Sequence, residues 1–162
     1  MTEYTNGDHH EPPRSSHWPK IEKSHLAAFP RCACCSPDEA PAAKHQVHHR
    51  LPFHYCIALG RPDLETDERN LITLCETTHG DPAPNHHLLI GHLGNFKSDN
   101  VHVGDDATLF MGLTAEQIQA DPRWMARKAT RLKLLTDMSD EEKADFRALM
   151  DAMFPLLEKV DA

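Results

Sequence analysis

The stretch that decides the fold reads Val47-His48-His49-Arg50-Leu51-Pro52-Phe53 at its centre. It begins at the Cys-x2-Cys pair of Cys32 and Cys35. Beyond the centre it continues through Asn70-Leu71-Ile72-Thr73-Leu74-Cys75 to Asn85-His86-His87-Leu88-Leu89-Ile90-Gly91-His92. Cysteines and histidines alternate here with short apolar runs. A domain this small is marginal on hydrophobic burial alone, so we expect bound metal to help it fold.

Two short strands are predicted on either side of a long connection. Lys44 to Leu51 and Asn70 to Cys75 carry the β-branched residues typical of strands, and Pro52 to Asp67 joins them. Asn85 is a favourable N-cap for a helix that begins at His86. The predicted order is therefore strand, connection, strand, helix.

Helices are predicted on both flanks of this stretch. Arg14 to Pro30 has the pattern of an amphipathic helix whose first turn contains Pro19. After residue 103, Thr114 and Gln117 form a capping box, and Trp124 to Leu135 is helix-like.

A last helix is predicted from a cap at Ser139 to about Lys159, with a kink at Pro155. It carries one apolar stripe, made of Phe146, Leu149, Met150, Met153, Leu156 and Leu157. This stripe would pack on the rest of the protein or dock a protein partner or a dimer mate.

Composition fits one domain with extensions. The chain has 162 residues, of which 40% are hydrophobic, and a formal net charge of -8. Residues 14–103 hold nine basic and ten acidic groups, so most of the negative charge lies in residues 1–13 and 104–162. Residues 1–13 are predicted to be a disordered tail. The acidity argues against simple non-specific nucleic-acid binding. No signal-peptide segment and no long apolar run is evident, so we expect a cytoplasmic protein without a membrane partner.

A structural zinc site is predicted from the cysteines. Cys-x2-Cys spacing lets Cys32 and Cys35 bind one tetrahedral Zn²⁺ from a single turn, and Cys75 at the end of the second strand supplies a third ligand. The fourth ligand is His79, at Cys-x3-His spacing, or His86 at the start of the helix.

These residues in this order resemble the HNH (His-Asn-His) endonucleases, also known as His-Me finger nucleases, in their zinc-stabilised subgroup. The resemblance implies an α+β fold, in which a small ββα-metal core with a structural zinc is flanked by an N-terminal helix and C-terminal helices. It covers residues 14–103 as the nuclease-like domain and leaves residues 104–162 as a helical extension. It also favours His86 as the fourth zinc ligand, because some similar chains have a cysteine at the corresponding place.

The resemblance implies a role for each residue of a second metal site. His48 would bind a catalytic divalent ion, His49 would be the general base, and Asn70 would tie the long connection so that His49 stays aimed. His87 and His92 would complete the ligands, although five residues on a regular α-helix turn a side chain by about 140°. They converge only if the helix contains a π-bulge or unwinds at Gly91.

The implied activity is metal-dependent hydrolysis of DNA phosphodiesters, with Mg²⁺, Mn²⁺, Ni²⁺ or Zn²⁺ as the catalytic ion and a phage or mobile element as the setting. His54, Arg50 and Lys97 are candidate substrate-binding residues; Ser98 and Asn100 beside Lys97 would hold a phosphate or cap a loop. A different class remains open, namely a non-catalytic zinc-stabilised module that binds nucleic acid or protein.

Overall fold

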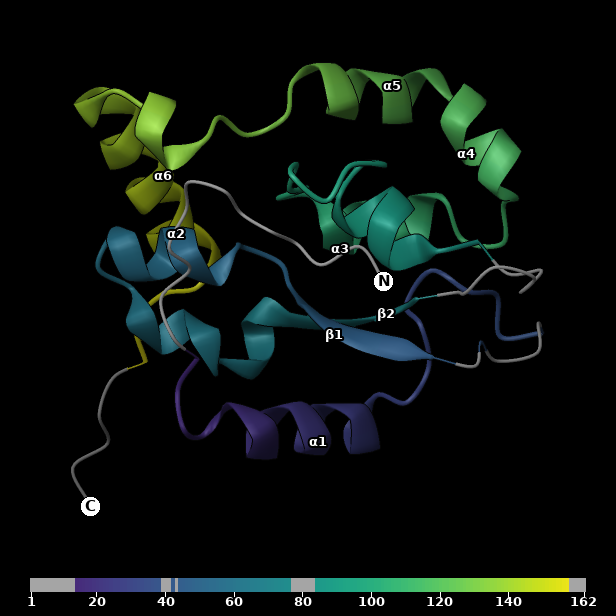
Figure 1. The fold of residues 1–162 in the computed structure, drawn as a ribbon, viewed down its shortest axis with the longest axis horizontal. Coiled ribbons are helices and arrows are strands. Elements are labelled where there is room, and N and C mark those ends of the chain that lie inside the picture. The colour runs from purple at the N-terminus through teal and green to yellow at the C-terminus, as the bar shows by residue number, and fades with distance from the viewer. Residues whose placement is uncertain (1–13, 39–41, 43, 77–83, 158–162) are drawn as a thin grey trace.

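The computed structural model of the chain describes residues 14–38, 42, 44–76 and 84–157, and its fold is α+β (Figure 1). The predicted tail over residues 1–13 lies outside this range. Two strands, β1 (His45–His49) and β2 (Leu71–Cys75), pair antiparallel, with His45 opposite Cys75 and His49 opposite Leu71. Both strands fall where the β-branched residues predicted them.

The two faces of the sheet are covered by different elements. Helix α1 (Trp18–Ala28) lies on one face, where Trp18 packs against Val47 and Leu71. The π-helix η3 (His87–Gly91) and helix α3 (Val103–Leu109) lie over the other face (Figure 1). Because side chains alternate along a strand, His48 projects toward η3 and His49 toward α1. The two adjacent histidines thus emerge on opposite sides at the end of β1.

A long connection joins the strands and builds a second core. It contains α2 (Phe53–Ala58), the 3₁₀ turns η1 (Pro62–Glu65) and η2 (Glu68–Asn70), and a turn at Gly60. Its apolar side chains pack against α6 (Asp140–Met153), the last described helix. The buried members of this core are Leu51, Tyr55, Cys56, Leu64, Phe146, Met150 and Phe154.

The C-terminal segment contains α4 (Ala115–Ala120), α5 (Pro122–Ala129) and the short turn η4 (Leu135–Asp137) before α6. The two predicted capping boxes, at Thr114 and Ser139, are both present. The indole of Trp124 donates a 2.8 Å hydrogen bond to the carbonyl of Leu89, so α5 is tied to η3. The segment is therefore packed onto the central stretch.

Two predicted helix ends were wrong. The helix expected to reach Leu135 stops at Ala129, where Thr130 leaves helical geometry and its hydroxyl bonds back to the carbonyl of Ala126. The last helix stops at Met153 and does not continue through a kink at Pro155. Proline disfavours helical geometry in the residue before it, and Phe154 has φ -132° and ψ 75°, which lie outside the helical region.

The apolar stripe of α6 is only partly buried. Phe146 and Met150 are buried in the second core, whereas Leu149, Met153, Leu156 and Leu157 are exposed. The prediction that the stripe packs on the rest of the protein is thus confirmed for Phe146 and Met150 alone.

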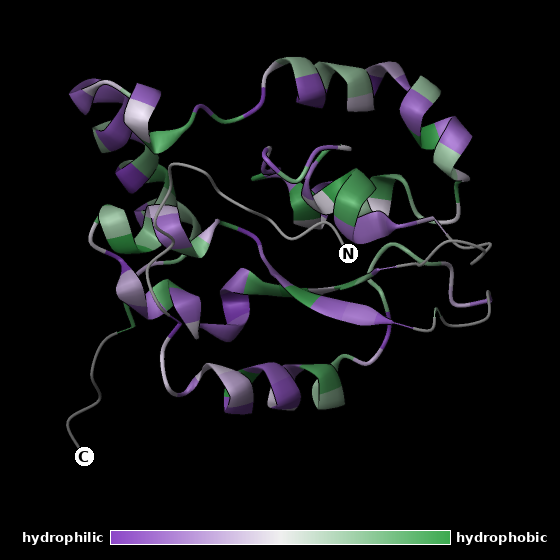
Figure 2. Cartoon of the chain, viewed as in Figure 1, coloured by the Kyte–Doolittle hydropathy of each residue, from purple (hydrophilic) through white to green (hydrophobic). Residues whose placement is uncertain are grey.

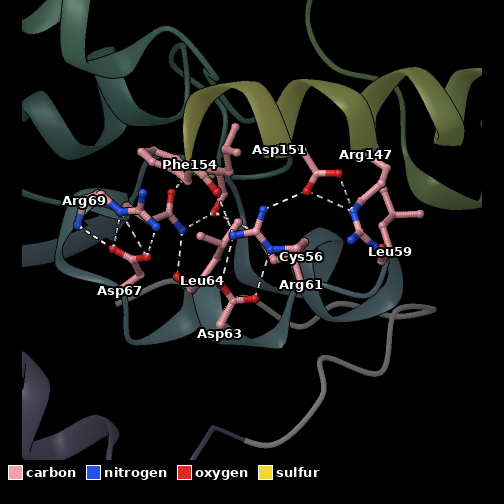
Figure 3. Close-up of polar contacts among 12 residues, drawn as sticks. Cys56, Leu59, Arg61, Asp63, Leu64, Asp67, Arg69, Arg147, Asp151 and Phe154 are labelled. Carbon is pink, nitrogen blue, oxygen red and sulfur yellow. Dashed lines mark hydrogen bonds and ion pairs between the residues drawn. The ribbon is translucent and has the colours of Figure 1, made fainter. Parts of the chain in front are cut away.

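A buried arginine joins α6 to the long connection (Figure 3). Arg61 is fully buried, and its guanidinium pairs with Asp63 at 2.9 Å and with Asp151 of α6 at 2.8 Å. It also donates a 2.7 Å hydrogen bond to the carbonyl of Phe154. A buried charge is tolerated only when it is paired in this way, so this network fixes where the C-terminal helix sits.

Strand β1 is polar although it lies between two layers (Figure 2). Its sequence is His45-Gln46-Val47-His48-His49, and the last two histidines are 7% and 6% exposed. Burying imidazoles costs free energy unless they find partners. The partners of these two histidines define the candidate functional site.

Candidate functional site

Four metal-ligating side chains converge at the far end of the sheet from His49. Cys32 and Cys35 come from the turn after α1, Cys75 ends β2, and His86 precedes η3. All four residues are buried. The cluster could hold a metal ion such as zinc, so the structure brings together the cysteines that the sequence analysis selected, with His86 as the fourth member.

The donor atoms have spacings that suit one tetrahedral ion. The Nδ1 atom of His86 lies 3.4 Å from the sulfurs of Cys32 and Cys35 and 3.3 Å from the sulfur of Cys75. The sulfurs of Cys35 and Cys75 are 3.9 Å apart. With Zn–S near 2.3 Å and Zn–N near 2.0 Å, tetrahedral geometry places two sulfurs about 3.8 Å apart and sulfur and nitrogen about 3.5 Å apart. The donor set therefore fits Zn²⁺.

The cluster also favours a thiolate. Hydrogen bonds from Cys35 and Cys75 lower the pKa of Cys32 well below its usual range. The amide N–H of Cys34 additionally points to the Cys32 sulfur at 3.4 Å. Zinc binds the deprotonated form of cysteine, so the local electrostatics agree with the ligand chemistry.

Two other residues of this stretch need separate mention. Cys34, which lies between Cys32 and Cys35 in the sequence, is fully buried in the apolar core and is absent from the group of four. His79, the alternative fourth ligand, lies outside the described residues.

Three imidazoles form a second cluster on the η3 side of the sheet. His48 comes from β1, His87 begins η3, and His92 directly follows its last residue. The ring of His48 lies 5.3 Å from that of His87 and 5.0 Å from that of His92, and one nitrogen of each residue lies within 4.8 Å of the others. This group could hold a metal ion, and it has the composition that the sequence analysis expected.

The π-helix explains how residues five apart can share one site. Its wider turn brings His92 back over His87, with their Nε2 atoms 3.2 Å apart. Asn85 starts this turn, because its side-chain oxygen accepts the amide hydrogen of Leu88 at 3.0 Å. The irregular helix that the spacing required is thus present.

The Nδ1 atoms of His87 and His92 face oxygen acceptors, which leaves their Nε2 atoms for the cluster. Nδ1 of His92 donates to the carbonyl of Ser98 at 2.8 Å, and Nδ1 of His87 lies 3.5 Å from a carboxylate oxygen of Glu76. Such outer partners fix the tautomer of a metal-binding imidazole. The two Nε2 atoms lie 3.2 Å apart, close enough to bind one ion together, so the donor set fits a divalent ion.

The charge state of these imidazoles also suits a metal. Burial, together with the neighbouring histidines, lowers the pKa of His48 well below its ordinary value. Burial likewise lowers the pKa of His92 to about 4 and lowers that of His87. The three rings are therefore neutral at pH 7, which is the form that binds metals.

Gly91 allows η3 to approach His48 closely. A Cβ atom at this position would lie 3.2 Å from Cε1 of His48 and 3.3 Å from its Nδ1. We expect Gly91→Ala to displace His48 from His87 and His92, and to weaken binding of Mn²⁺ or Ni²⁺ to this cluster by about tenfold. Calorimetric titration measures the affinity, with His92→Ala as the positive control. Unchanged affinity in Gly91→Ala would show that the three histidines do not bind the ion together.

His49 is held by a different set of contacts. Its Nε2 donates to the carbonyl of Glu65 at 2.8 Å, so in the neutral ring Nδ1 carries the lone pair. The indole of Trp18 stacks on the ring at 4.8 Å, and the ring of Phe53 lies at 5.5 Å. Burial lowers the pKa of His49 to about 4, opposed by the Glu65 carbonyl and assisted by Arg14. The ring is thus neutral, oriented and able to accept a proton at Nδ1.

Asn70 ties down the connection that carries Glu65. Its side-chain oxygen accepts the amide hydrogen of Leu51 at 2.8 Å, and its amide donates to the carbonyls of Leu51 and Leu64. Asn70 is fully buried. Because Leu64 precedes Glu65, the asparagine fixes the carbonyl that orients His49.

Asn70→Ala should therefore lower the stability of the protein. It leaves the Leu51 and Leu64 backbone groups without their partner, and we expect the free energy of unfolding to fall by about 2–4 kcal/mol. Urea unfolding measures the difference. Asn95→Ala is the matched control, since that exposed amide bonds only locally, to the Lys97 N–H at 2.9 Å, and its loss should cost no more than about 0.5 kcal/mol. Equal effects of the two substitutions would contradict this role of Asn70.

The candidate substrate-binding residues lie in different places. The Arg50 guanidinium lies against Gly104 at the first turn of α3, and its charge acts on His48. His54 is half-buried in α2 beside Tyr55, and Lys97 is exposed in the turn after η3. Neither belongs to either metal cluster.

The surroundings of Ser98 and Asn100 favour the loop-capping interpretation. Both are buried, and the Asn100 side chain bonds the carbonyl of Ile90 and the carboxylate of Asp106.

Several contributors to the site have no sequence signal. The Glu65 carbonyl orients His49, the Ser98 carbonyl orients His92, and Arg14 contacts His49. Two of these act through backbone oxygens, which every residue possesses. Only the three-dimensional contacts could have identified them.

Within the described residues, no helix is both long enough and apolar enough to cross a membrane. Comparisons of the chain with protein-family models, with curated proteins and with solved structures gave no match.

Proposed function

We propose that this protein is a metal-dependent endonuclease of the HNH type that hydrolyses DNA phosphodiester bonds. The observation that carries the proposal is the arrangement around the end of β1. Three neutral imidazoles converge on one side, and an oriented imidazole follows directly in the sequence on the other. An asparagine-bound connection holds that second imidazole. The geometry of each part suits the role that the HNH resemblance implies.

Two arginines extend this arrangement. Arg14 contacts His49 on the α1 side, and Arg50 lies near His48 on the α3 side. A phosphodiester laid across the end of β1 would meet both guanidinium groups, which bind phosphate oxygens through paired hydrogen bonds. This local positive charge supports an anionic substrate despite the net charge of -8.

In the proposed reaction, His49 accepts at Nδ1 a proton from the attacking water. The water oxygen bonds to phosphorus as the bond from phosphorus to the 3′ oxygen breaks. The products are a 5′-phosphate and a 3′-hydroxyl, whose proton comes from solvent. A divalent ion held by His48, His87 and His92 would supply positive charge beside the phosphate and the leaving oxygen. The Glu65 carbonyl stabilises the imidazolium formed at His49.

Metal-dependent cleavage tests the proposal. The protein is stripped of loosely held ions and incubated with supercoiled plasmid, and separately with RNA, while Mg²⁺, Mn²⁺, Ni²⁺ or Zn²⁺ is added back. We expect nicked or linear plasmid only when an ion is present, and none with His87→Ala. Cleavage of RNA alone would redirect the substrate class. No cleavage of either substrate with any ion would refute a nuclease.

A non-catalytic zinc module is the second candidate. The completeness of the Cys32, Cys35, Cys75 and His86 cluster favours it, because that cluster stabilises the fold without requiring chemistry at His49. This candidate predicts about one tightly held zinc per chain, binding of a nucleic acid or protein, and the same binding after His49→Ala.

A further inference from the structure

The basic nitrogen of His49 is covered by an arginine from the segment that precedes α1. Nη1 of Arg14 lies 3.4 Å from Nδ1 of His49. Nε2 of His49 is already engaged by the Glu65 carbonyl. While the guanidinium donates a hydrogen bond to Nδ1, that nitrogen cannot accept a proton from water.

The guanidinium is held at this place by two aromatic rings. Its carbon lies 4.0 Å from the centre of the Phe53 ring and 4.7 Å from that of Trp18. Cation–π contacts of this kind attract the guanidinium to the ring faces. The same two rings also contact His49, so the guanidinium and the imidazole are both positioned by Trp18 and Phe53.

The segment that carries Arg14 is anchored to the connection that orients His49. The amide N–H of Ser15 donates a 2.7 Å hydrogen bond to the side chain of Glu65. Glu65 thus holds His49 through its backbone and the Arg14 segment through its carboxylate. Arg14 itself is exposed, whereas His49 is buried. A substrate arriving from solvent therefore meets the guanidinium before the imidazole.

We propose that Arg14 is a phosphate-binding residue that covers the general base in the free protein and uncovers it when a phosphodiester binds. A hydrogen bond from guanidinium to a phosphate oxygen joins two charges and is roughly twice as strong as one to a neutral acceptor. The guanidinium therefore leaves the neutral Nδ1 for the phosphate. It then holds the phosphate beside the uncovered nitrogen, where water can be deprotonated. This inference rests on the proposed nuclease function.

Steady-state plasmid cleavage by the full chain tests it, with wild type, Arg14→Ala, Arg14→Lys and Lys20→Ala compared. Lys20 is the matched control, an exposed cation near the start of α1. We expect Arg14→Ala to lower kcat/KM by about 10- to 100-fold, Arg14→Lys to recover part of the loss, and Lys20→Ala to stay within about twofold. The salt dependence of KM should also become shallower by about one unit of log–log slope in Arg14→Ala alone.

The outcomes separate the inference from the function on which it rests. Wild-type cleavage with an unchanged Arg14→Ala variant would overturn the inference and leave the nuclease intact. A faster Arg14→Ala variant would also overturn it, because Arg14 would then only block the base. Absence of cleavage by wild type with every ion would overturn the nuclease function and this inference with it.

Discussion

His49→Ala is expected to lower the cleavage rate by about 10²–10⁴-fold while the protein stays folded and retains its zinc. General-base catalysis contributes an effect of this size. The substitution removes the imidazole whose Nδ1, which contacts Arg14, is the proposed proton acceptor. It does not alter any side chain of the two metal clusters. Plasmid cleavage under saturating metal measures the rate, and circular dichroism and zinc content monitor the fold.

His45→Ala is the matched control for this prediction. His45 lies on the same strand, is half-buried and belongs to neither cluster. Its replacement should leave the rate within about threefold of wild type, given that surface substitutions away from a site have small effects. If His49→Ala and His45→Ala cleaved equally well, His49 would not be the base. If His49→Ala lost its zinc, the comparison would instead show that His49 supports the fold.

The sequence was most informative where structure depends on local residue types. β-branched residues predicted both strands, and the capping boxes at Thr114 and Ser139 predicted the starts of two helices. The five-residue spacing of His87 and His92 even required an irregular helix, which the structure shows as a π-helix. Ligand chemistry is likewise local, since cysteine and histidine are the residues that bind zinc.

The sequence was least informative where tertiary packing determines the position of a residue or the end of a helix. From the sequence alone, Arg61 would be expected at the surface. It is buried because Asp63, Asp151 and the carbonyl of Phe154 surround it in the fold. The end of α6 depends on how Phe154 enters the second core as well as on Pro155. Arg14 has no periodic or spacing signal, because its proposed role follows from the position of one aromatic pair relative to His49.

The Cys32, Cys35, Cys75 and His86 cluster connects the fold to the site. It joins the turn after α1, the end of β2 and the start of η3, and His86 is followed directly by His87. An ion here would therefore fix where η3 starts, and so where His87 and His92 lie relative to His48. The structural site would position the second cluster as well as stabilise the chain.

Cys75→Ser should consequently have the largest effect on stability. Serine is a poor zinc ligand, and structural zinc contributes about 10–16 kcal/mol of apparent binding free energy in zinc-finger peptides. Small domains have only about 5–15 kcal/mol of net stability, so we expect loss of bound zinc and of the cooperative thermal transition. Elemental analysis of the purified protein and calorimetry measure these two quantities. Chelation of zinc from the wild type should give the same result.

Cys34→Ala separates the metal effect from the loss of a buried thiol. Cys34 is fully buried beside Cys35 but lies outside the cluster. Its truncation should keep about one zinc per chain and cost roughly 1–2 kcal/mol through lost packing. A Cys75→Ser protein that kept both its zinc and the thermal midpoint of the wild type would show that Cys75 is not a ligand. If Cys75→Ser lost the zinc but unfolded like Cys34→Ala, the ion would contribute little to stability, and η3 would be held by core packing alone.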